Sequence, residues 1–450
     1  MPAVRSRRRW RRSSMRVLSF TAGAANMICG SCLRDNALAK ELMRLGHEVV
    51  LMPIYTPTLT DETNVSEGEV LFSGINVWLQ QNVPLFRRTP RFLDRVFESP
   101  SLLRWAAQRQ IKTDPHFLGA MTVSMLDGEA GVLRKEFLKL GEWLSAEPEF
   151  DIINIPFTLL IAFAKTIKGI RNAPVICTLQ GEDLFLDGLD EPYRTQALDR
   201  IADHSRYVDA FVAVSDYYAH YMVEYLRIPE EKVHAAPLGI SLEGHSAART
   251  SHGNTFHIGY LARIAPEKGL HVLADAYHRL RQRPGLPPSK LLVAGWLGEE
   301  SRGYLAGIER QMREWGLGDQ FEYRGVLTRE EKIEFLHSLD VLSVPTVYPD
   351  PKGTFVLEAM ANSIPVVQPR CGAFPEIIET TGGGLLVEPN DPESLAEGLL
   401  SLWEDPDLAL ELGHRGYDGL REHYTAAHMA RRTVDIWERV SAPVLRSAVR

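Results

Sequence analysis

The residues best suited to chemistry are two cations after a predicted strand in the C-terminal half. Arg263 follows the apolar run 256–261, and Lys268 lies five residues further on, behind a proline at a natural helix start. Two cations at one strand end suit a diphosphate. A lysine in a first helical turn opposes the helix dipole by roughly 0.3–1 kcal/mol, and a bound anion would reverse that cost. Taken alone, the pair fits two solvated surface cations equally well.

A second feature is a helix start that begins with glycine. Gly353 and Thr354 open the helical run 355–361, and the free N–H groups of a helix start can bind phosphate oxygens. Glu358 is a single acid among Val, Leu, Ala and Met, so it should have a partner, because burying an unpaired carboxylate is costly. Thr354 and Glu358 are four residues apart and share a helix face. With phosphate at the helix start, Glu358 would reach a ribose; the alternative is a half-exposed helical glutamate.

The elements that must position these residues alternate between strand and helix. In the first half we predict strands at 16–21, 48–53, 151–155, 175–179, 210–214 and 233–236, with helices near 33–45, 158–170 and 217–227. In the second half we predict strands at 256–261, 290–294, 341–344, 364–368 and 385–387, with helical segments filling 391–445. Such βα series form parallel sheets, whose ligands bind outside the carboxyl ends of the strands. The fold class is therefore α/β, with two Rossmann-like βαβ domains facing a cleft.

The domain organisation follows from these series and from local composition. We expect an N-terminal Rossmann-like domain over 15–240, interrupted by a largely helical excursion over 57–148 with one strand-like piece at 75–79. The polar segment 241–254 is predicted to be the linker, and a second Rossmann-like domain covers 255–424.

Charge and apolar content exclude several classes of protein. The net charge of the 450 residues is −8, but residues 1–14 carry six Arg, and the rest has 44 basic and 58 acidic residues. A body so acidic is a poor general nucleic-acid binder. The longest apolar stretch, 152–164, is too short to span a membrane. We expect residues 1–14 to be a basic, disordered leader, since no apolar segment follows as in a secretory signal; the alternative is a tether to anionic lipid.

Familiar catalytic motifs are absent from the sequence. It contains no G-x-G-x-x-G, no P-loop, no H-E-x-x-H and no G-x-S-x-G. Cys29 and Cys32 form a C-x-x-C pair, but a cysteine protease is excluded because no histidine lies between His116 and His204. A small-residue loop is the favoured interpretation of the pair, and a redox role stays open. Four cysteines do not make a disulfide framework and fit a reducing cytoplasm.

Over about 255–425 the chain resembles the family 4 glycosyltransferases, which are retaining enzymes of the two-domain GT-B fold. Four stretches carry the resemblance: 259–269 (GYLARIAPEKG), 350–361 (DPKGTFVLEAMA), 372–376 (GAFPE) and 383–392 (GGLLVEPNDP). The stretch 259–269 is similar to the family's G-x-L-x-x-x-P-E-K-G pattern, and 350–361 resembles its E-x7-E motif. The N-terminal half is similar more loosely, and in this fold the last helix, here within 425–450, packs back on the first domain.

The resemblance implies roles for particular residues. The donor-binding set would be Arg263, Lys268, Gly353, Thr354, Phe355 and Glu358, the catalytic pair Asp350 and Glu358, and the candidate sugar or acceptor contacts Gly30, Ser31 and Gln180. Four positions depart from the family pattern: Asp350 replaces a Glu, Gln180 replaces a His, Leu238 replaces an Asn, and Ser31 replaces a Gly. The first two changes fall on groups expected to hold the donor sugar.

The implied activity is transfer of a hexose from a nucleotide-diphosphate sugar to a hydroxyl of a glycan, glycolipid or small molecule. Retention of configuration, no metal and no cofactor belong to the same implication. The four cysteines favour a cytoplasmic location, and the basic residues 1–14 leave peripheral contact at the inner membrane face as an alternative. No nucleic-acid partner is expected. Two alternatives stay open: an epimerase-like GT-B enzyme acting on nucleotide sugars, and a nucleotide-sugar-binding protein with weakened transfer.

Overall fold

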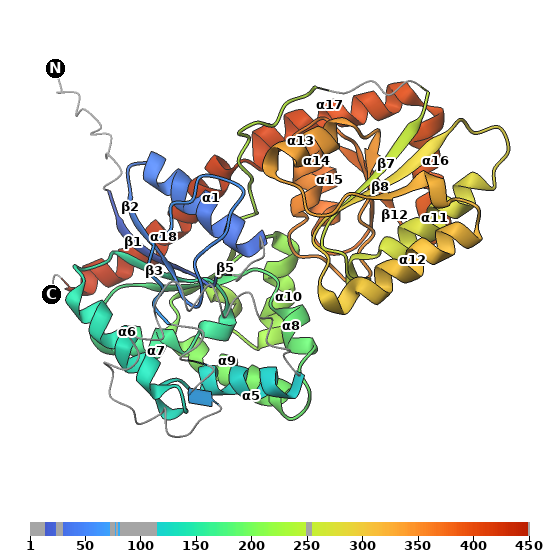
Figure 1. Cartoon of the computed structure of the whole chain (residues 1–450). Helices are drawn as coiled ribbons and strands as arrows, with labels where there is room; N and C mark the ends of the chain where they lie inside the picture. The colour runs from blue at the N-terminus through green and yellow to red at the C-terminus, as the bar shows by residue number, and fades with distance from the viewer. Residues whose placement is uncertain are drawn as a thin grey trace, which may run out of the picture.

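The described residues form two six-stranded parallel sheets, each covered by helices (Figure 1). The computed structural model describes residues 14–23, 30–72, 77, 80–81, 115–248 and 254–448. Residues 1–13 of the predicted leader and Cys29 lie outside this description. The predicted α/β class with two Rossmann-like domains is confirmed.

The first sheet has the strand order β2-β1-β3-β4-β5-β6. Its strands are β1 (Arg16–Thr21), β2 (Glu48–Pro53), β3 (Ile152–Ile155), β4 (Val175–Leu179), β5 (Ala210–Ala213) and β6 (Val233–Ala235). Every residue of β3, β4 and β5 is buried. Strands covered on both faces need continuous apolar runs, which is why the sequence located them.

Helices cover both faces of this sheet. They are α1 (Gly30–Arg44), α5 (Pro115–Leu126), α6 (Arg134–Ala146), α7 (Phe163–Ile170), α8 (Asp183–Asp187), α9 (Tyr193–His204) and α10 (Asp216–Leu226). The predicted strand at 75–79 lies mostly outside the described residues, and its one described residue, Val77, is helical, so the prediction is wrong there.

The second sheet has the order β12-β11-β10-β7-β8-β9. Its strands are β7 (Phe256–Leu261), β8 (Ser289–Ala294), β9 (Phe321–Tyr323), β10 (Val341–Leu342), β11 (Val366–Pro369) and β12 (Gly384–Val387). The order reverses between β7 and β10, and ligands of such sheets bind at this switch point, outside the carboxyl ends of the strands. The sequence had not predicted β9, a three-residue edge strand.

The helices of the second half complete this domain. They are α11 (Leu270–Arg281), α12 (Arg302–Glu314), α13 (Arg329–His337), α14 (Thr354–Met360), α15 (Phe374–Thr381), α16 (Pro392–Glu404) and α17 (Pro406–His423). Among the helices described here and above, together with α18 below, none is both long enough and apolar enough to cross a membrane.

The last helix, α18 (Ala426–Ala448), leaves the second domain and lies beside α1 of the first, as Figure 1 shows. The chain thus crosses between the domains twice. The two crossings are hydrogen-bonded to each other: Ile240 N–H donates to the Tyr424 carbonyl at 3.0 Å, and Ala426 N–H to the Ile240 carbonyl at 2.8 Å. Gly239 allows this approach, because a Cβ there would lie 2.1 Å from the Thr425 carbonyl oxygen.

Burial of Trp437 on α18 gives a stability prediction. This side chain is 1% exposed and belongs to the same buried cluster as Ala37 and Leu38 of α1. We expect Trp437→Ala to lower the free energy of unfolding by about 3–5 kcal/mol, because it leaves a large cavity. Urea unfolding followed by circular dichroism measures this, with the exposed Leu410→Ala as control. A loss below about 1 kcal/mol, typical of surface changes, would show that α18 does not share this core.

Candidate functional site

The loop after β7 places Lys268 at the switch point of the second sheet. Residues Pro266–Lys268 form a single 3-10 turn, and α11 begins only at Leu270. The helix start predicted at Pro266 is therefore present, but as a 3-10 turn that is separate from α11. Gly269 connects the two pieces at φ 75°, and a Cβ there would lie 1.8 Å from the Pro345 carbonyl oxygen. Only glycine lets this loop pack so closely against the loop after β10.

Lys268 is bound to that second loop by its ammonium group. The Nζ atom donates to Asp350 Oδ2 at 2.6 Å and to the Tyr348 hydroxyl at 2.7 Å. It also lies 4.9 Å from the centre of the Tyr348 ring. The side chain is 16% exposed. Because an ammonium has three hydrogens and two are used, one remains for a ligand.

The Asp350 carboxylate is the organising group of the loop. Its Oδ1 accepts from the N–H groups of Lys352 and Gly353, at 2.9 and 3.0 Å. Its Oδ2 accepts from Lys268 and from the Tyr348 hydroxyl, the latter at 2.9 Å. Burial alone would raise the pKa of Asp350, but the Lys268 ammonium and the two backbone N–H groups hold it well below its usual range. Asp350 is therefore ionised and fully engaged with its own chain.

Arg263 pairs with a different carboxylate from Lys268. Its guanidinium is 40% exposed and pairs with Glu267, four residues along. Each cation is held by a different carboxylate in this conformation, and the convergence of the two on one ligand stays a prediction. Surface pairs of this kind contribute about 0–1 kcal/mol, so an anionic ligand could exchange for Glu267 at small cost.

The helix start at Gly353 has the predicted form with one difference. Gly353 is the N-cap of α14, at φ 61°. The sequence predicts that its N–H is free, but in the structure this group donates to Asp350. The N–H groups of Thr354 and Phe355 follow in the first turn, where helix geometry provides no intrahelical acceptor. These two donors are the ones that a phosphate could reach.

Glu358 has the partner that its burial requires. Its Oε1 accepts from Lys332 Nζ of α13 at 2.7 Å, and its side chain is 14% exposed. Thr354 and Glu358 line the same pocket, together with His245 and Arg329. Burial lowers the pKa of His245 to about 4, so this imidazole is neutral at pH 7.

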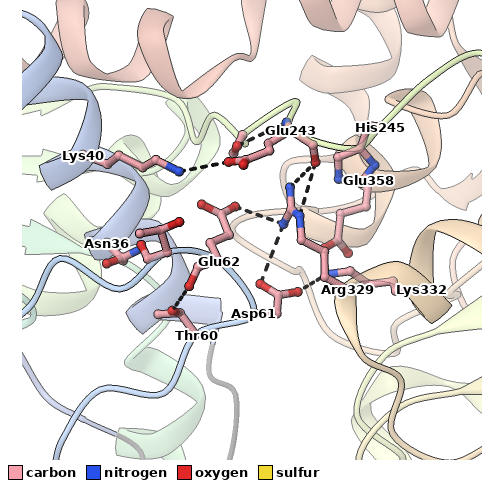
Figure 2. Close-up of polar contacts among 12 residues, drawn as sticks. Asn36, Lys40, Thr60, Asp61, Glu62, Glu243, His245, Arg329, Lys332 and Glu358 are labelled. Atoms are coloured by element: carbon pink, nitrogen blue, oxygen red, sulfur yellow. Dashed lines mark hydrogen bonds and ion pairs between the residues drawn. The ribbon is translucent and has the colours of Figure 1, made fainter.

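The sequence interpretation missed the cations of α13 and the acids that face them. Arg329 and Lys332 contact Asp61 and Glu62 of the first domain (Figure 2). The helix itself has a readable signal, a capping box between Thr328 and Glu331. No local pattern connects it to residue 61, however, because 271 positions separate the two partners.

Gly30 and Ser31 lie where the first domain meets the loop before α14. Gly30 begins α1 and lines the same pocket as Glu358. The Ser31 hydroxyl accepts from Lys352 Nζ at 2.9 Å, which connects the two domains directly. Behind them Asp35 is buried beside Arg34, and burial raises the pKa of Asp35 to about 6.

Gln180 follows β4 and faces the same junction. Its Nε2 donates to the Pro156 carbonyl at 2.7 Å, and its side chain is buried. Its Oε1 is buried without a hydrogen-bond partner, so it can accept from a ligand hydroxyl. Next to it, a Cβ on Gly181 would lie 3.1 Å from the Pro351 side chain of the second domain.

Within the described ranges, no group of three or more His, Cys, Asp or Glu side chains is arranged to hold a metal ion. Cys32 is 1% exposed in α1, and its C-x-x-C partner lies outside the described residues. Burial raises the pKa of Cys371 to about 11, with Asp350 nearby adding to the effect. This thiol is therefore neutral at physiological pH.

Two family models match the chain. The model for glycosyl transferases group 1 matches residues 245–419, and the model for glycosyltransferase family 4 matches residues 113–243. Together they cover more than half of the 450 residues. The chain belongs to the group 1, family 4 glycosyltransferases, and the predicted family is confirmed.

Curated relatives agree with the family. An alpha-maltose-1-phosphate synthase of Mycolicibacterium smegmatis is 32% identical over 225 residues, which are 48% of this chain and 52% of that protein. A D-inositol 3-phosphate glycosyltransferase of Corynebacterium jeikeium is 28% identical over 35% of this chain and 37% of that protein. The chain spans about half the length, or less, of these curated relatives.

Solved structures share the two-domain architecture. The sucrose-phosphate synthase of Thermosynechococcus elongatus has a TM-score of 0.68 at 16% identity, covering 95% of this chain and 100% of that one. Anabaena HepE in complex with UDP has a TM-score of 0.64 at 15% identity, covering 94% and 100%. At such identities the likeness establishes the GT-B fold, which confirms the predicted architecture, including the final helix that returns to the first domain.

The engagement of Asp350 gives a testable pH dependence. We expect Asp350→Asn to lower the free energy of unfolding at pH 7 by about 3 kcal/mol, because it leaves the Lys268 charge without its counter-ion. The folded-state pKa of Asp350 is depressed, so its contribution is complete above 3.8, the unperturbed value, and is lost as the pH falls further. Urea titrations of both proteins at pH 7, 5 and 3 should show a difference that shrinks only at pH 3. A difference independent of pH would contradict the ionised state of Asp350 in the folded protein.

Proposed function

We propose that this protein transfers a hexose from a nucleotide-diphosphate sugar to an acceptor hydroxyl, with retention of configuration and without a metal ion. The proposal rests on three features that are grouped at the switch point. They are the Lys268 ammonium, the first-turn N–H groups of α14, and Glu358 one turn further along the same helix face. Family membership and the UDP and UDP-glucose complexes of HepE support a nucleotide-sugar donor.

The leaving diphosphate would be stabilised by the second domain. The remaining Lys268 hydrogen and the N–H groups of Thr354 and Phe355 can all donate to phosphate oxygens, and the helix start adds its partial positive charge. Arg263 reaches the same ligand when it exchanges Glu267 for a phosphate. Donors fixed in place before the reaction act on charge as it develops, which is the largest catalytic term in many enzymes.

The proposed reaction needs no covalent intermediate between the sugar and the enzyme. The bond between the anomeric carbon and the diphosphate oxygen breaks, and the acceptor oxygen forms a bond to the same carbon on the same face. The electron pair of the broken bond goes to the diphosphate, and the acceptor proton goes to a phosphate oxygen. In this scheme Glu358 accepts from the two ribose hydroxyls. Asp350 acts by holding Lys268 and the loop before α14 in place.

The acceptor would enter from the first domain. Gly30 and Ser31 at the start of α1 and the unpaired Oε1 of Gln180 are the candidate contacts for the transferred sugar or the acceptor. We expect a hydroxyl of a glycan, a glycolipid or a small molecule. The cytoplasmic location, with membrane contact through the basic residues 1–14, stays a prediction.

Nucleotide binding without metal is the first test. A nucleoside diphosphate at 100 times its dissociation constant should stabilise the native protein by about 2.7 kcal/mol, which raises the melting temperature by several degrees in a chain of this size. Melting curves in EDTA with UDP, GDP and ADP measure the effect and identify the base. If stabilisation appears only when Mg²⁺ is added, the proposal that the protein binds the diphosphate without a metal ion is wrong.

Glu358→Gln tests the ribose contact. Loss of a charge-assisted hydrogen bond of about 1.5–3 kcal/mol should raise the dissociation constant of the preferred nucleoside diphosphate roughly 10- to 100-fold. The fold should persist, because Lys332 keeps Asp61 as its partner. Calorimetry measures the affinity, with the exposed Glu379→Gln of α15 as a matched control. Equal affinity in wild type and Glu358→Gln would remove Glu358 from the site.

A nucleotide-sugar-binding protein without transfer is the second candidate. It is favoured because the Asp350 carboxylate accepts four hydrogen bonds from its own chain. It is also favoured because Gln180 stands where the family has a His. Incubation with the donor that the melting curves select, with and without a panel of hydroxyl acceptors, separates the candidates. Acceptor-dependent release of nucleoside diphosphate supports transfer. Tight binding with no release across the panel supports the binding protein.

A further inference from the structure

The loop that follows β2 carries two acids into the cleft between the domains. Asp61 Oδ2 accepts from Lys332 Nζ at 2.6 Å, and Glu62 Oε1 accepts from the Arg329 guanidinium at 3.2 Å (Figure 2). A longer ion pair of 3.8 Å joins Arg329 and Asp61. The four side chains are only 8–12% exposed. The cleft is therefore closed here by ion pairs between the two domains.

The loop is built as part of the first domain. Asn36 of α1 accepts from the Val65 N–H at 2.9 Å and donates to the Thr63 carbonyl at 3.0 Å. The Thr60 hydroxyl donates to the Glu62 carbonyl at 2.8 Å. These contacts fix the loop to α1, so the two acids move with the first domain.

The acids lie against the group proposed to hold the ribose. Lys332 is shared, because it donates to Glu358 at 2.7 Å as well as to Asp61. Glu62 lines the same pocket as Thr354 and Glu358, and its Oε2 is buried without a hydrogen-bond partner. Burial raises the pKa of Glu62 despite the neighbouring Arg329. This carboxylate is incompletely satisfied where it is.

The space left in this pocket is too small for a nucleotide. The cavity between the acids, Thr354 and Glu358 measures about 30 Å³. That volume holds about one water molecule, whereas ligand pockets measure roughly 300–1,000 Å³. A donor can reach Glu358 only when Asp61 and Glu62 move away from α13.

We infer that Asp61 and Glu62 are an internal occupant of the nucleoside end of the donor pocket, which donor binding displaces. The inference rests on the proposed function. The closed form binds no donor, so the measured dissociation constant equals the intrinsic one divided by the fraction of molecules that are open. Weakening the ion pairs raises that fraction and therefore tightens donor binding.

The isosteric double variant Asp61→Asn/Glu62→Gln tests this directly. Both cations keep a partner in it: Lys332 retains Glu358 at 2.7 Å, and Arg329 retains the Glu243 carbonyl at 2.7 Å. The fold should therefore persist, and circular dichroism checks it. The matched control is Asp199→Asn/Glu379→Gln, which removes two acids from exposed ion pairs outside the cleft.

Calorimetry with UDP, GDP and ADP gives the readout. We expect the dissociation constant of the preferred nucleoside diphosphate to fall about fivefold or more in the double variant, the lower end of typical coupling between sites, and to stay unchanged in the control. An unchanged constant in the folded double variant overturns the inference. So does a weaker one, which would make the two acids direct ligands of the donor.

A second measurement separates this inference from the proposed function. If the wild type and the double variant both bind none of the three nucleotides, the proposed function fails, and the inference with it. If the wild type binds and the variant binds equally well, only the inference fails. Each acid changed singly then shows whether the pair of Asp61 or that of Glu62 carries the effect.

Discussion

The site depends on one buried carboxylate, that of Asp350. A charge 3% exposed is tolerable only when its lone pairs are filled, and four donors fill them. The loop after β11 joins the same residue: Ala373 N–H donates to the Asp350 carbonyl at 2.9 Å, and a Cβ on Gly372 would lie 2.4 Å from that oxygen. Loops from β7, β10 and β11 therefore converge on a single side chain and its backbone. Their positions relative to one another are fixed before any ligand arrives.

The charges around this centre are closely balanced. Lys268 faces Asp350, Arg263 faces Glu267, and Lys332 faces Glu358. Each of these three cations therefore has a carboxylate partner in the conformation described. An anionic ligand must exchange partners rather than fill an empty positive pocket, and the cost differs between sites, since the Arg263 pair is exposed and the Lys268 pair is buried.

Sequence reasoning succeeded where local physics decides the outcome. The strands at 16–21, 48–53 and 256–261 were predicted with the observed bounds, because each contains apolar residues that are buried in its sheet. It failed where tertiary context decides. Edge strand β9 has only three residues and is half-buried, so no apolar run marks it. The pair of Asp61 and Lys332 has no local trace, because folding alone brings together residues so far apart.

The double crossing between the domains has a mechanical consequence. One flexible tether would let the domains twist and slide in any direction. Here the segments at Ile240 and Thr425 run side by side and are hydrogen-bonded as a short parallel bridge. Gly239 keeps them in contact, because any side chain there would meet the neighbouring backbone. Two segments joined in this way act as a hinge between the domains. Rotation of one domain about an axis near the bridge is the easiest motion, and translation along the cleft is resisted.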